Sequence, residues 1–372
     1  MRPSVPDLTV AMPPPGPLLR RLWDRLVLAG WSGALVALVV LSSLLGRRRF
    51  THDLGVAAAG TLRIVDEPAF PAHEFFAAGR AFPCRVRHAD DVYFDNAKLV
   101  LRGASVKFAD AEVKSPLDLI LNSGAINVTP TVREFLEFIP PTMKGRGDHY
   151  LPLFERHPVA RRASELGVRR NPESYSRVHY YSQVPEGFVA GDGEPRLARY
   201  RLLPKAGGAE SGLPSGADLA AFPNQARVQD DDRPRTYLVE EFNRRVHDHG
   251  VGYRLQLQLH EVSADDGVEV YNSGEEWDEA THPWHDLATI ELDRPLGRAE
   301  SCRTTFYLRN RPPSLPLLPA RSIDDYNSIN HVRAATGPGR TARRLAYKLF
   351  GLPAALPDPV APEPVVKPGD ER

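Results

Sequence analysis

The chain of 372 residues carries 47 Lys and Arg against 47 Asp and Glu, so its formal net charge at pH 7 is zero. A chain without excess positive charge is a poor candidate for sequence-independent nucleic-acid binding, and we expect no nucleic-acid partner. Its two cysteines, Cys84 and Cys302, are too few for a disulfide framework or a four-cysteine zinc site. Hydrophobic residues make up 42% of the sequence, which is enough for the middle of the chain to bury a core.

The N-terminal region divides into two parts. Residues 1–18 are rich in proline, which is typical of a disordered leader. Residues 19–46 predict an apolar helix, within which positions 26–45 form a run of 20 residues without a charge. A helix needs about 20 apolar residues to cross a bilayer, so this one has the length of a membrane anchor. The alternative is a helix covered by the rest of the protein. The chain is therefore expected to be either membrane-associated or cytoplasmic.

Short alternating apolar runs follow this helix, and glycine, proline, asparagine or aspartate bounds each of them. Such a pattern is typical of strands joined by turns. Strands are predicted within residues 61–65, 98–102, 105–108, 178–203, 252–262 and 287–292. Helical patterns cover residues 131–139, 157–168, 235–249, 322–333 and 340–349. Residues 351–372 are again rich in proline, and we expect a disordered tail.

The order of these elements indicates the fold class. Most strands follow one another directly, which favours an antiparallel sheet over an alternating βαβ arrangement. We therefore predict an α+β fold over residues 47–350. It consists of a closed antiparallel β-barrel with inserted and appended helices, preceded by the apolar helix.

One region of the sequence carries an ordered set of motifs. Arg49 and His52 form an R-x-x-H pair, and Arg87 follows on a later predicted strand. The segment R-G-A-S-V-K-F at residues 102–108 comes next, and then Asn122. Further on lie Y-Y-S-Q at 180–183, G-D-G at 191–193 and Y-R-L-L-P at 200–204. Near the end of the chain, Tyr326 precedes Arg333 by seven residues.

This set of motifs, in this order over residues 47–335, resembles the catalase superfamily. The resemblance implies a haem b cofactor. It assigns His52 and Asn122 to the distal side of the haem and Tyr326 to the iron as its proximal ligand. It also implies that arginines bind the haem propionates and that an aromatic residue lines the pocket. The residues that match these roles are Arg49, Arg87, Arg333 and Phe135.

The chemistry that the resemblance implies fits these residue types. A tyrosinate is an anionic ligand that stabilises ferric haem, and its phenol needs a nearby cation to lower its pKa. Arg321 or Arg333 would supply that charge. A distal imidazole can take the proton of a bound peroxide and return it to the distal oxygen, and an amide can hydrogen-bond the peroxide.

Each of these residues also has an ordinary structural interpretation. A histidine at the start of a strand is commonly a polar surface residue. An asparagine before Ser-Gly is commonly a turn residue. Tyr326 could equally be a packed aromatic, so its role depends on the resemblance.

Three positions depart from hydrogen-peroxide-dismutating catalases. Thr51 replaces the valine that usually precedes the distal histidine, as in the catalase-related allene oxide synthases. Ala89 replaces a serine that would orient that histidine. The proximal arginine that normally lies four residues before the tyrosine is offset to Arg321. These changes favour a haem enzyme acting on organic hydroperoxides, with His52, Asn122 and Thr51 in the catalytic roles.

Three functional hypotheses stay open. The first is a haem-dependent enzyme that rearranges or reduces lipid or other small-molecule hydroperoxides. The second is a small catalase or peroxidase using hydrogen peroxide, and the third is a non-catalytic haem- or lipid-binding scaffold. The sequence leaves the oligomeric state open, with a homodimer as one option.

Overall fold

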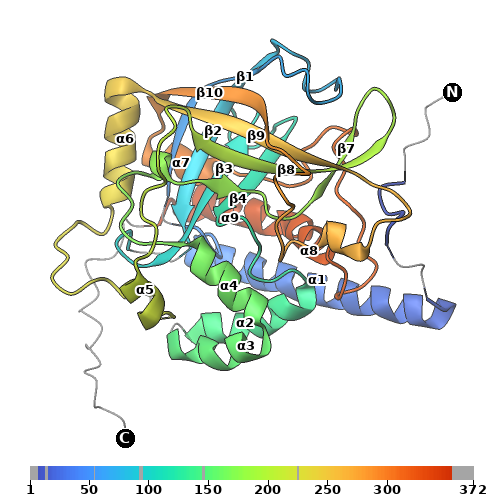
Figure 1. The fold of residues 1–372 in the computed structure, drawn as a ribbon. Helices are drawn as coiled ribbons and strands as arrows, with labels where there is room; N and C mark the ends of the chain where they lie inside the picture. Colours follow the sequence, from blue (N-terminus) through green and yellow to red (C-terminus); the bar gives the residue numbers. More distant parts are fainter. Residues whose placement is uncertain are drawn as a thin grey trace, which may run out of the picture.

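A computed structural model describes residues 7–12, 16–53, 55–91, 95–144, 147–223 and 226–353. Eight strands of this described chain close into an antiparallel β-barrel in the spatial order β3-β2-β1-β10-β9-β8-β6-β4, with β4 pairing back to β3 (Figure 1). These strands are β1 (Gly55–Ile64), β2 (Ala81–Asp90), β3 (Val100–Lys107), β4 (Asp118–Ser123), β6 (Tyr180–Tyr181), β8 (Pro195–Pro204), β9 (Val251–Glu261) and β10 (His285–Pro295). Two further strands, β5 (Val168–Arg169) and β7 (Glu186–Val189), pair with β3 and β8 outside this circuit.

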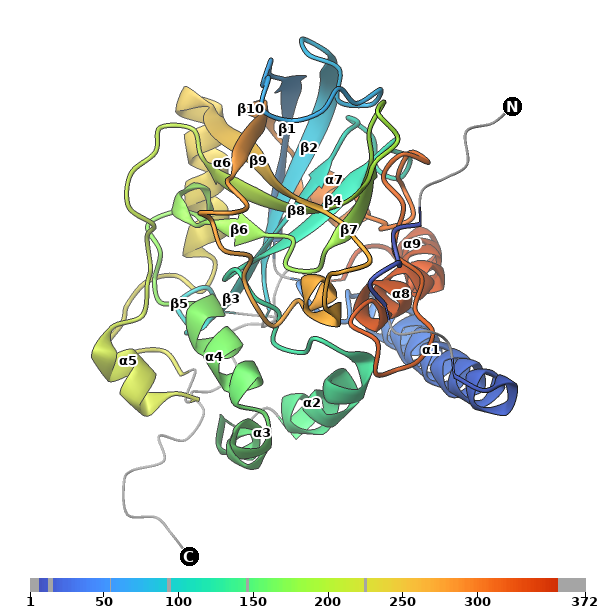
Figure 2. The same cartoon turned by 45° about the vertical axis from the view of Figure 1, so that its right-hand side comes forward.

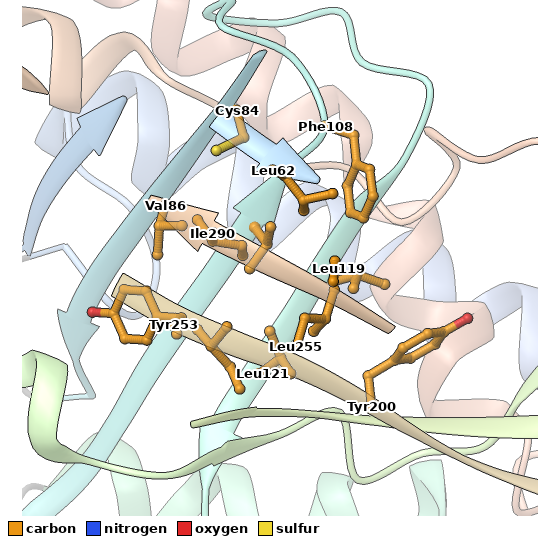
Figure 3. Close-up of a cluster of buried hydrophobic side chains, with 14 of the residues drawn as sticks. Leu62, Cys84, Val86, Phe108, Leu119, Leu121, Tyr200, Tyr253, Leu255 and Ile290 are labelled. Atoms are coloured by element: carbon orange, nitrogen blue, oxygen red, sulfur yellow. The ribbon is translucent and has the colours of Figure 1, made fainter. Parts of the chain in front are cut away.

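The inward-pointing side chains of the strands fill the barrel. Side chains from all the long strands meet in one buried cluster inside it, which includes Leu62, Val86, Leu121, Leu255 and Ile290 (Figure 3). Successive side chains of a strand point to opposite faces, so the residues between these face outward. The outward face of β2, β3 and β4 is therefore available to a site, while the inward face holds the fold together.

Helices are appended around the barrel. Nine α-helices lie within the described residues. They are α1 (Leu18–Gly46), α2 (Val132–Lys144), α3 (Leu151–Arg156), α4 (Pro158–Gly167), α5 (Gly216–Ala221), α6 (Tyr237–His249), α7 (Arg298–Arg303), α8 (Ser328–Ala335) and α9 (Gly337–Phe350). Short 3-10 helices occur at η1 (Gly147–Tyr150), η2 (Tyr175–Arg177) and η3 (Val268–Tyr271). The predicted fold class, a closed antiparallel barrel with helices and an N-terminal apolar helix, is confirmed.

The first and last helices pack against each other beside the barrel (Figure 2). A Cβ at Gly339 would lie 2.3 Å from a methyl carbon of Val39, so the glycine permits close contact between α1 and α9. At the other end of the contact, Arg47 donates to the carbonyl of Phe350 at 2.8 Å. The two helices thus run in the same direction, and α1 is attached to the domain along its C-terminal half.

Helix α1 is apolar on both sides. Leu28 and Ser43 on one side are buried, whereas Leu26, Leu41 and Leu45 on the other are exposed. By length and composition α1 is the one helix of the described chain that could cross a membrane, and only 17% of its most apolar window is buried by the protein. An apolar face of this kind is unusual for a helix that meets water.

The structure also refines several sequence boundaries. The helix expected at 322–333 begins only at Ser328 because the carboxylate of Asp325 accepts the backbone N–H groups of Arg321 and Ser322 and holds them in a turn. Within the region expected to be a disordered leader, Leu8 and Met12 are buried in a cluster with Tyr271 and Trp277. The proline-rich tail expected at 351–372 lies outside the described residues from position 354 onward.

Candidate active site on the outer barrel face

A row of small residues crosses the outer face of the barrel. Ala89 of β2 pairs with Gly103 of β3, and Gly103 pairs with Asn122 of β4. The residues preceding Ala89 and Asn122, His88 and Leu121, point into the barrel, so this row points outward. The row provides a flat floor that ends in the amide of Asn122.

The imidazole of His52 lies over this floor. A Cβ at Gly103 would be 3.2 Å from Nδ1 and 3.3 Å from Cε1 of His52, so only glycine gives the ring its present position without a shift. His52 itself has a φ of 56°, in the left-handed region that residues other than glycine rarely adopt. Such backbone geometry commonly occurs at functional sites. The structure thus brings His52 and Asn122 to neighbouring positions around Gly103.

The loop that carries His52 is fixed by two arginines. Arg87 of β2 donates to the carbonyl oxygens of His52 and Asp53, at 3.0 and 2.9 Å. Arg49 donates through its backbone N–H to the carboxylate of Asp53 and through its guanidinium to the carbonyl of Thr304. Arg49, His52 and Arg87, which the sequence predicts together, therefore lie together.

The electrostatic surroundings keep the His52 ring neutral. Its Nδ1 is buried and has no hydrogen-bond partner among the described residues. Burial lowers the pKa of His52 below its ordinary value, Arg87 and Arg333 lower it further, and Asp91 opposes them. A neutral imidazole can accept a proton, which is what a distal base requires.

Arg333 also lies near this site, at the C-terminal end of α8. Burial lowers the pKa of its guanidinium, which donates to the side-chain oxygen of Asn330 at 3.4 Å. Together with Arg49 and Arg87, Arg333 places a third cation around the loop of His52.

Two arginines of α9 were missed by the sequence reasoning. Arg343 is 4% exposed, and its Nε and Nη2 have no hydrogen-bond partner in the described chain. Nη1 of Arg340 is buried and equally unpartnered among these residues. Both lie in electrostatic range of Arg49. The spacing of Gly339, Arg343 and Ala346 on one buried helix face could have signalled that Arg343 points inward.

Tyr326 lies in different surroundings. It packs at the edge of the cluster that contains Leu8 and Met12. Burial raises the pKa of its phenol, and Glu134, Glu275 and Glu269 raise it further. The described contacts do not bring Tyr326 to His52.

The remaining predicted residues occupy separate positions. The guanidinium of Arg321 donates to the hydroxyl of Thr9 at 3.4 Å, on the side of the N-terminal segment. Phe135 packs beside Val184 and the residues of α1 and α8 that cover it. Thr51, next to His52, is exposed.

A cleft lies beyond Asn122 on the same outer face. Tyr181 pairs with Asn122, and the amide of Asn122 donates to Gln183 at 3.4 Å. Tyr181 and Gln183 line a small open cleft of about 40 Å³ together with Trp277 and Trp284. The floor around His52 thus continues into an open aromatic surface.

Comparison with known proteins relates this site to others. No protein-family model matches the sequence. Over 298 residues, 79% of the chain, it is 38% identical to the allene oxide synthase-lipoxygenase protein of Plexaura homomalla. Over 304 residues it is 29% identical to the linolenate 9R-lipoxygenase of a Nostoc strain. The chain spans only 28% and 38% of the length of these two relatives.

Solved structures show the same fold. A bacterial catalase superposes with a TM-score of 0.61 at 15% identity, over 80% of this chain and 59% of that one. Catalase A of Saccharomyces cerevisiae gives 0.61 at 14% identity, over 82% and 63%. The chain is a catalase-related protein. It combines a catalase fold with clear sequence similarity to the allene oxide synthase-lipoxygenase protein.

The residues of this catalase-related protein can be tested against haem, the cofactor that its fold implies. On the distal side they fit, because a neutral imidazole, whose buried Nδ1 has no partner among the described residues, lies over Gly103, which pairs with Asn122. The unpartnered arginine nitrogens fit the anionic edge of the ligand. On the proximal side, Tyr326 has acidic neighbours, so ferric iron itself would have to lower the pKa of the phenol.

Proposed function

We propose that this protein is a haem-dependent enzyme that acts on organic hydroperoxides, with fatty-acid hydroperoxides as the preferred class. The observation that carries the proposal is the neutral imidazole of His52, with its Nδ1 buried, above Gly103, the residue that pairs with Asn122. The similarity to a protein named as an allene oxide synthase supports the substrate class. Thr51, before His52, supports it too, because it replaces the valine of dismutating catalases.

In this proposal, haem b provides the iron at which the O–O bond of the hydroperoxide breaks. Tyr326 would ligate that iron, and Arg321 and Arg333 are the cations nearest to it in sequence. Arg49, Arg87 and Arg333 would bind the propionates through charge-assisted hydrogen bonds. Phe135 would line the pocket.

The protein's own residues move the protons. Neutral His52 takes the proton of the hydroperoxide group and returns it to the distal oxygen, while Asn122 donates a hydrogen bond to the peroxide. For an allene oxide synthase reaction, a second hydrogen leaves the carbon chain, and one hydroperoxide gives one epoxide and one water. The balance needs no external oxidant or reductant. In this proposal the hydroxyl of Thr51, the residue before His52, would contact the same oxygen.

The test uses full-length protein reconstituted with haem. We expect a high-spin ferric spectrum typical of tyrosinate ligation, and loss of that spectrum in Tyr326→Phe. Incubation with a polyunsaturated fatty-acid hydroperoxide should remove the diene absorbance. Oxygen evolution from hydrogen peroxide without hydroperoxide turnover would instead establish a catalase. A haem-bound protein inactive with both substrates, and unchanged by loss of His52, would be a binding scaffold.

We also propose that α1 attaches the protein to an anionic lipid surface and lies along that surface. Its outer face exposes Leu26, Leu41 and Leu45, and α9 adds exposed Leu349 and Phe350. Both helices also carry exposed basic residues, namely Arg20, Arg21, Arg25, Arg344 and Lys348. Because α1 is packed against α9, crossing the bilayer would require that contact to break.

Vesicle sedimentation tests this attachment. We expect the protein to sediment with vesicles of phosphatidylglycerol and phosphatidylcholine, and to be released by alkaline carbonate. The triple variant Leu26→Ser, Leu41→Ser, Leu45→Ser should stay in the supernatant and keep its haem spectrum. Resistance to carbonate would indicate a spanning helix, and absence of sedimentation would contradict the attachment.

A further inference from the structure

Two arginines of helix α9 point into the protein, where no carboxylate of the described residues pairs with them. Arg343 is almost fully buried, and Arg340 buries Nη1. Neither forms an ion pair with a carboxylate among the described residues, and three of their nitrogens lack any hydrogen-bond partner there. Arg85, another buried arginine, differs, because it pairs with both Asp110 and Glu300.

The positions of the two arginines are set by packing. Gly339 holds the start of α9 against Val39 of α1, and the guanidinium of Arg340 lies 4.8 Å from the ring centre of Tyr307. Arg49 donates to the carbonyl of Thr304, three residues before Tyr307, and Arg343, one turn beyond Arg340, lies in electrostatic range of Arg49 and Arg87. The two arginines of α9 therefore lie near the arginines of the His52 region.

Bringing these positive charges together destabilises the folded protein when no ligand is bound. Burial lowers the pKa of Arg343 far below its ordinary value, and repulsion from Arg49 and Arg87 adds to this effect. Burial likewise lowers the pKa of Arg340 to about 10 and that of Arg87 to about 9. A buried charge without a partner is destabilising, whereas a bound anion would satisfy all of these groups together.

We propose that Arg340 and Arg343, acting with Arg49 and Arg87, form a binding site for the carboxylates of a bound ligand. The inference rests on the proposed function, since it assigns the anionic end of that same site. Planar guanidinium groups bind carboxylates through paired hydrogen bonds. Two sources supply this chemistry, the propionates of haem and the carboxylate of a fatty acid. Neither α9 arginine belongs to the motif set in which Arg49, Arg87 and Arg333 were recognised.

Titration of the apoprotein tests the site and identifies the source. Haem b and its dimethyl ester, which has no free carboxylate, are titrated into full-length wild type, Arg340→Met and Arg343→Met, and Soret absorbance is followed. We expect each variant to bind haem b about tenfold or more weakly and to bind the ester as the wild type does. Arg63→Met, at an exposed position on β1 far along the strand from the His52 loop, is the control and should bind both like the wild type.

A second arm addresses fatty acids. Haem-loaded proteins are titrated with linoleic acid and methyl linoleate, and the Soret shift reports binding. Weaker binding of the acid alone in the Arg340 and Arg343 variants, with unchanged haem affinity, would assign the carboxylate to the fatty acid. Unchanged affinity for both carboxylates in both variants would overturn the proposal. A wild type that does not bind haem would overturn the proposed function instead.

Thermal unfolding distinguishes a loss of ligand binding from misfolding of a variant. Because methionine removes an unpaired buried charge, the Arg343→Met apoprotein should unfold at the same temperature as the wild type or higher. The stabilisation that haem b gives should be smaller in the variant than in the wild type. A variant apoprotein that unfolds at a clearly lower temperature would show a structural role for Arg343 and contradict the inference.

Discussion

Two places on one barrel wall hold buried charges under opposite conditions, one inside the barrel at Asp90 and Arg102 and the other outside it beside the His52 loop. On the inner face, Asp90 of β2 pairs with Arg102 of β3, and both side chains are fully buried. The hydroxyl of Tyr175 donates to Asp90 at 2.9 Å, and Arg102 donates to the carbonyl of Asn96 at 2.7 Å. This network closes the end of the barrel with its charges balanced.

On the outer face, Lys107 is likewise paired with Asp118, but Arg87 beside the His52 loop forms no ion pair with a carboxylate among the described residues. Arg87 immediately precedes His88 in sequence. Because successive side chains of a strand point to opposite faces, Arg87 points outward to the His52 loop and His88 points into the barrel. The inner histidine donates to or accepts from the hydroxyl of Tyr253 at 2.7 Å, and its ring stacks on Tyr175. The comparison indicates that the paired buried groups maintain the fold, and under the proposed function the unpaired arginines beside the His52 loop bind the ligand.

The largest effect is expected on the outer face. His52→Asn removes the proton acceptor, while asparagine tolerates the positive φ better than most residues. Turnover of a fatty-acid hydroperoxide by the haem-loaded enzyme should fall about 10²- to 10⁴-fold, the usual contribution of a positioned acid–base group. Steady-state kinetics measures this, and the unfolding temperature should stay close to that of the wild type. A variant with wild-type turnover would remove His52 from the mechanism.

A substitution on the inner face should lower the stability of the protein. Arg102→Met leaves Asp90 buried and unpaired, and we expect a loss of about 3–5 kcal/mol in the free energy of unfolding. Denaturant titration measures the loss. The matched control is the double variant Asp90→Leu, Arg102→Met, which removes both charges and should recover much of the stability. If the single variant were as stable as the wild type, the contrast between the two faces would fail.

The sequence predicted the barrel because its strands alternate strictly and end at turn residues. The stretch 252–262 illustrates this, since it corresponds to β9 within one residue. The distal residues could also be predicted, because Arg49, His52 and Arg87 act through contacts between segments that the motif order already relates. Local pattern and motif order therefore determined much of the distal side.

The rest depends on packing that sequence spacing does not show. Gly103 was noticed as part of a motif, but its role as the floor under His52 follows from the register of β2, β3 and β4. Arg340 and Arg343 look like ordinary surface arginines of an amphipathic helix, and only the contact of α9 with α1 turns them inward. The surroundings of Tyr326 depend on Leu8 and Met12, which lie in a region that composition alone describes as disordered.

Acid should act chiefly through the inner histidine. Burial lowers the pKa of His88 to about 3, so the unfolded chain binds a proton below pH 6.5 that the folded protein does not take up until near pH 3. Stability is therefore fully present above pH 6.5 and declines as the pH falls below it. By pH 5 the single group should cost about 2 kcal/mol.

His88→Gln isolates that contribution, since the amide can still hydrogen-bond to Tyr253 and does not titrate. Denaturant titrations at pH 7.5 and pH 5 should show a smaller difference in unfolding free energy for the variant than for the wild type. His247→Gln, at an exposed helix end, is the control and should keep the wild-type difference. Equal pH dependence of wild type and His88→Gln would contradict a neutral buried His88.

The smallest effect tests the floor of the outer site. In Gly103→Ala the new methyl group lies 3.2 Å from Nδ1 of His52, so the ring must move by a few tenths of an ångström. The strain opposes the gain from a less flexible unfolded chain, and the unfolding free energy should change by about 1 kcal/mol or less. Turnover should nevertheless fall several-fold, and Gly103→Val should lower it further at the same haem occupancy. Full activity in both variants would mean that the ring of His52 does not rest on Gly103 during turnover, and the outer face would lose its defining contact.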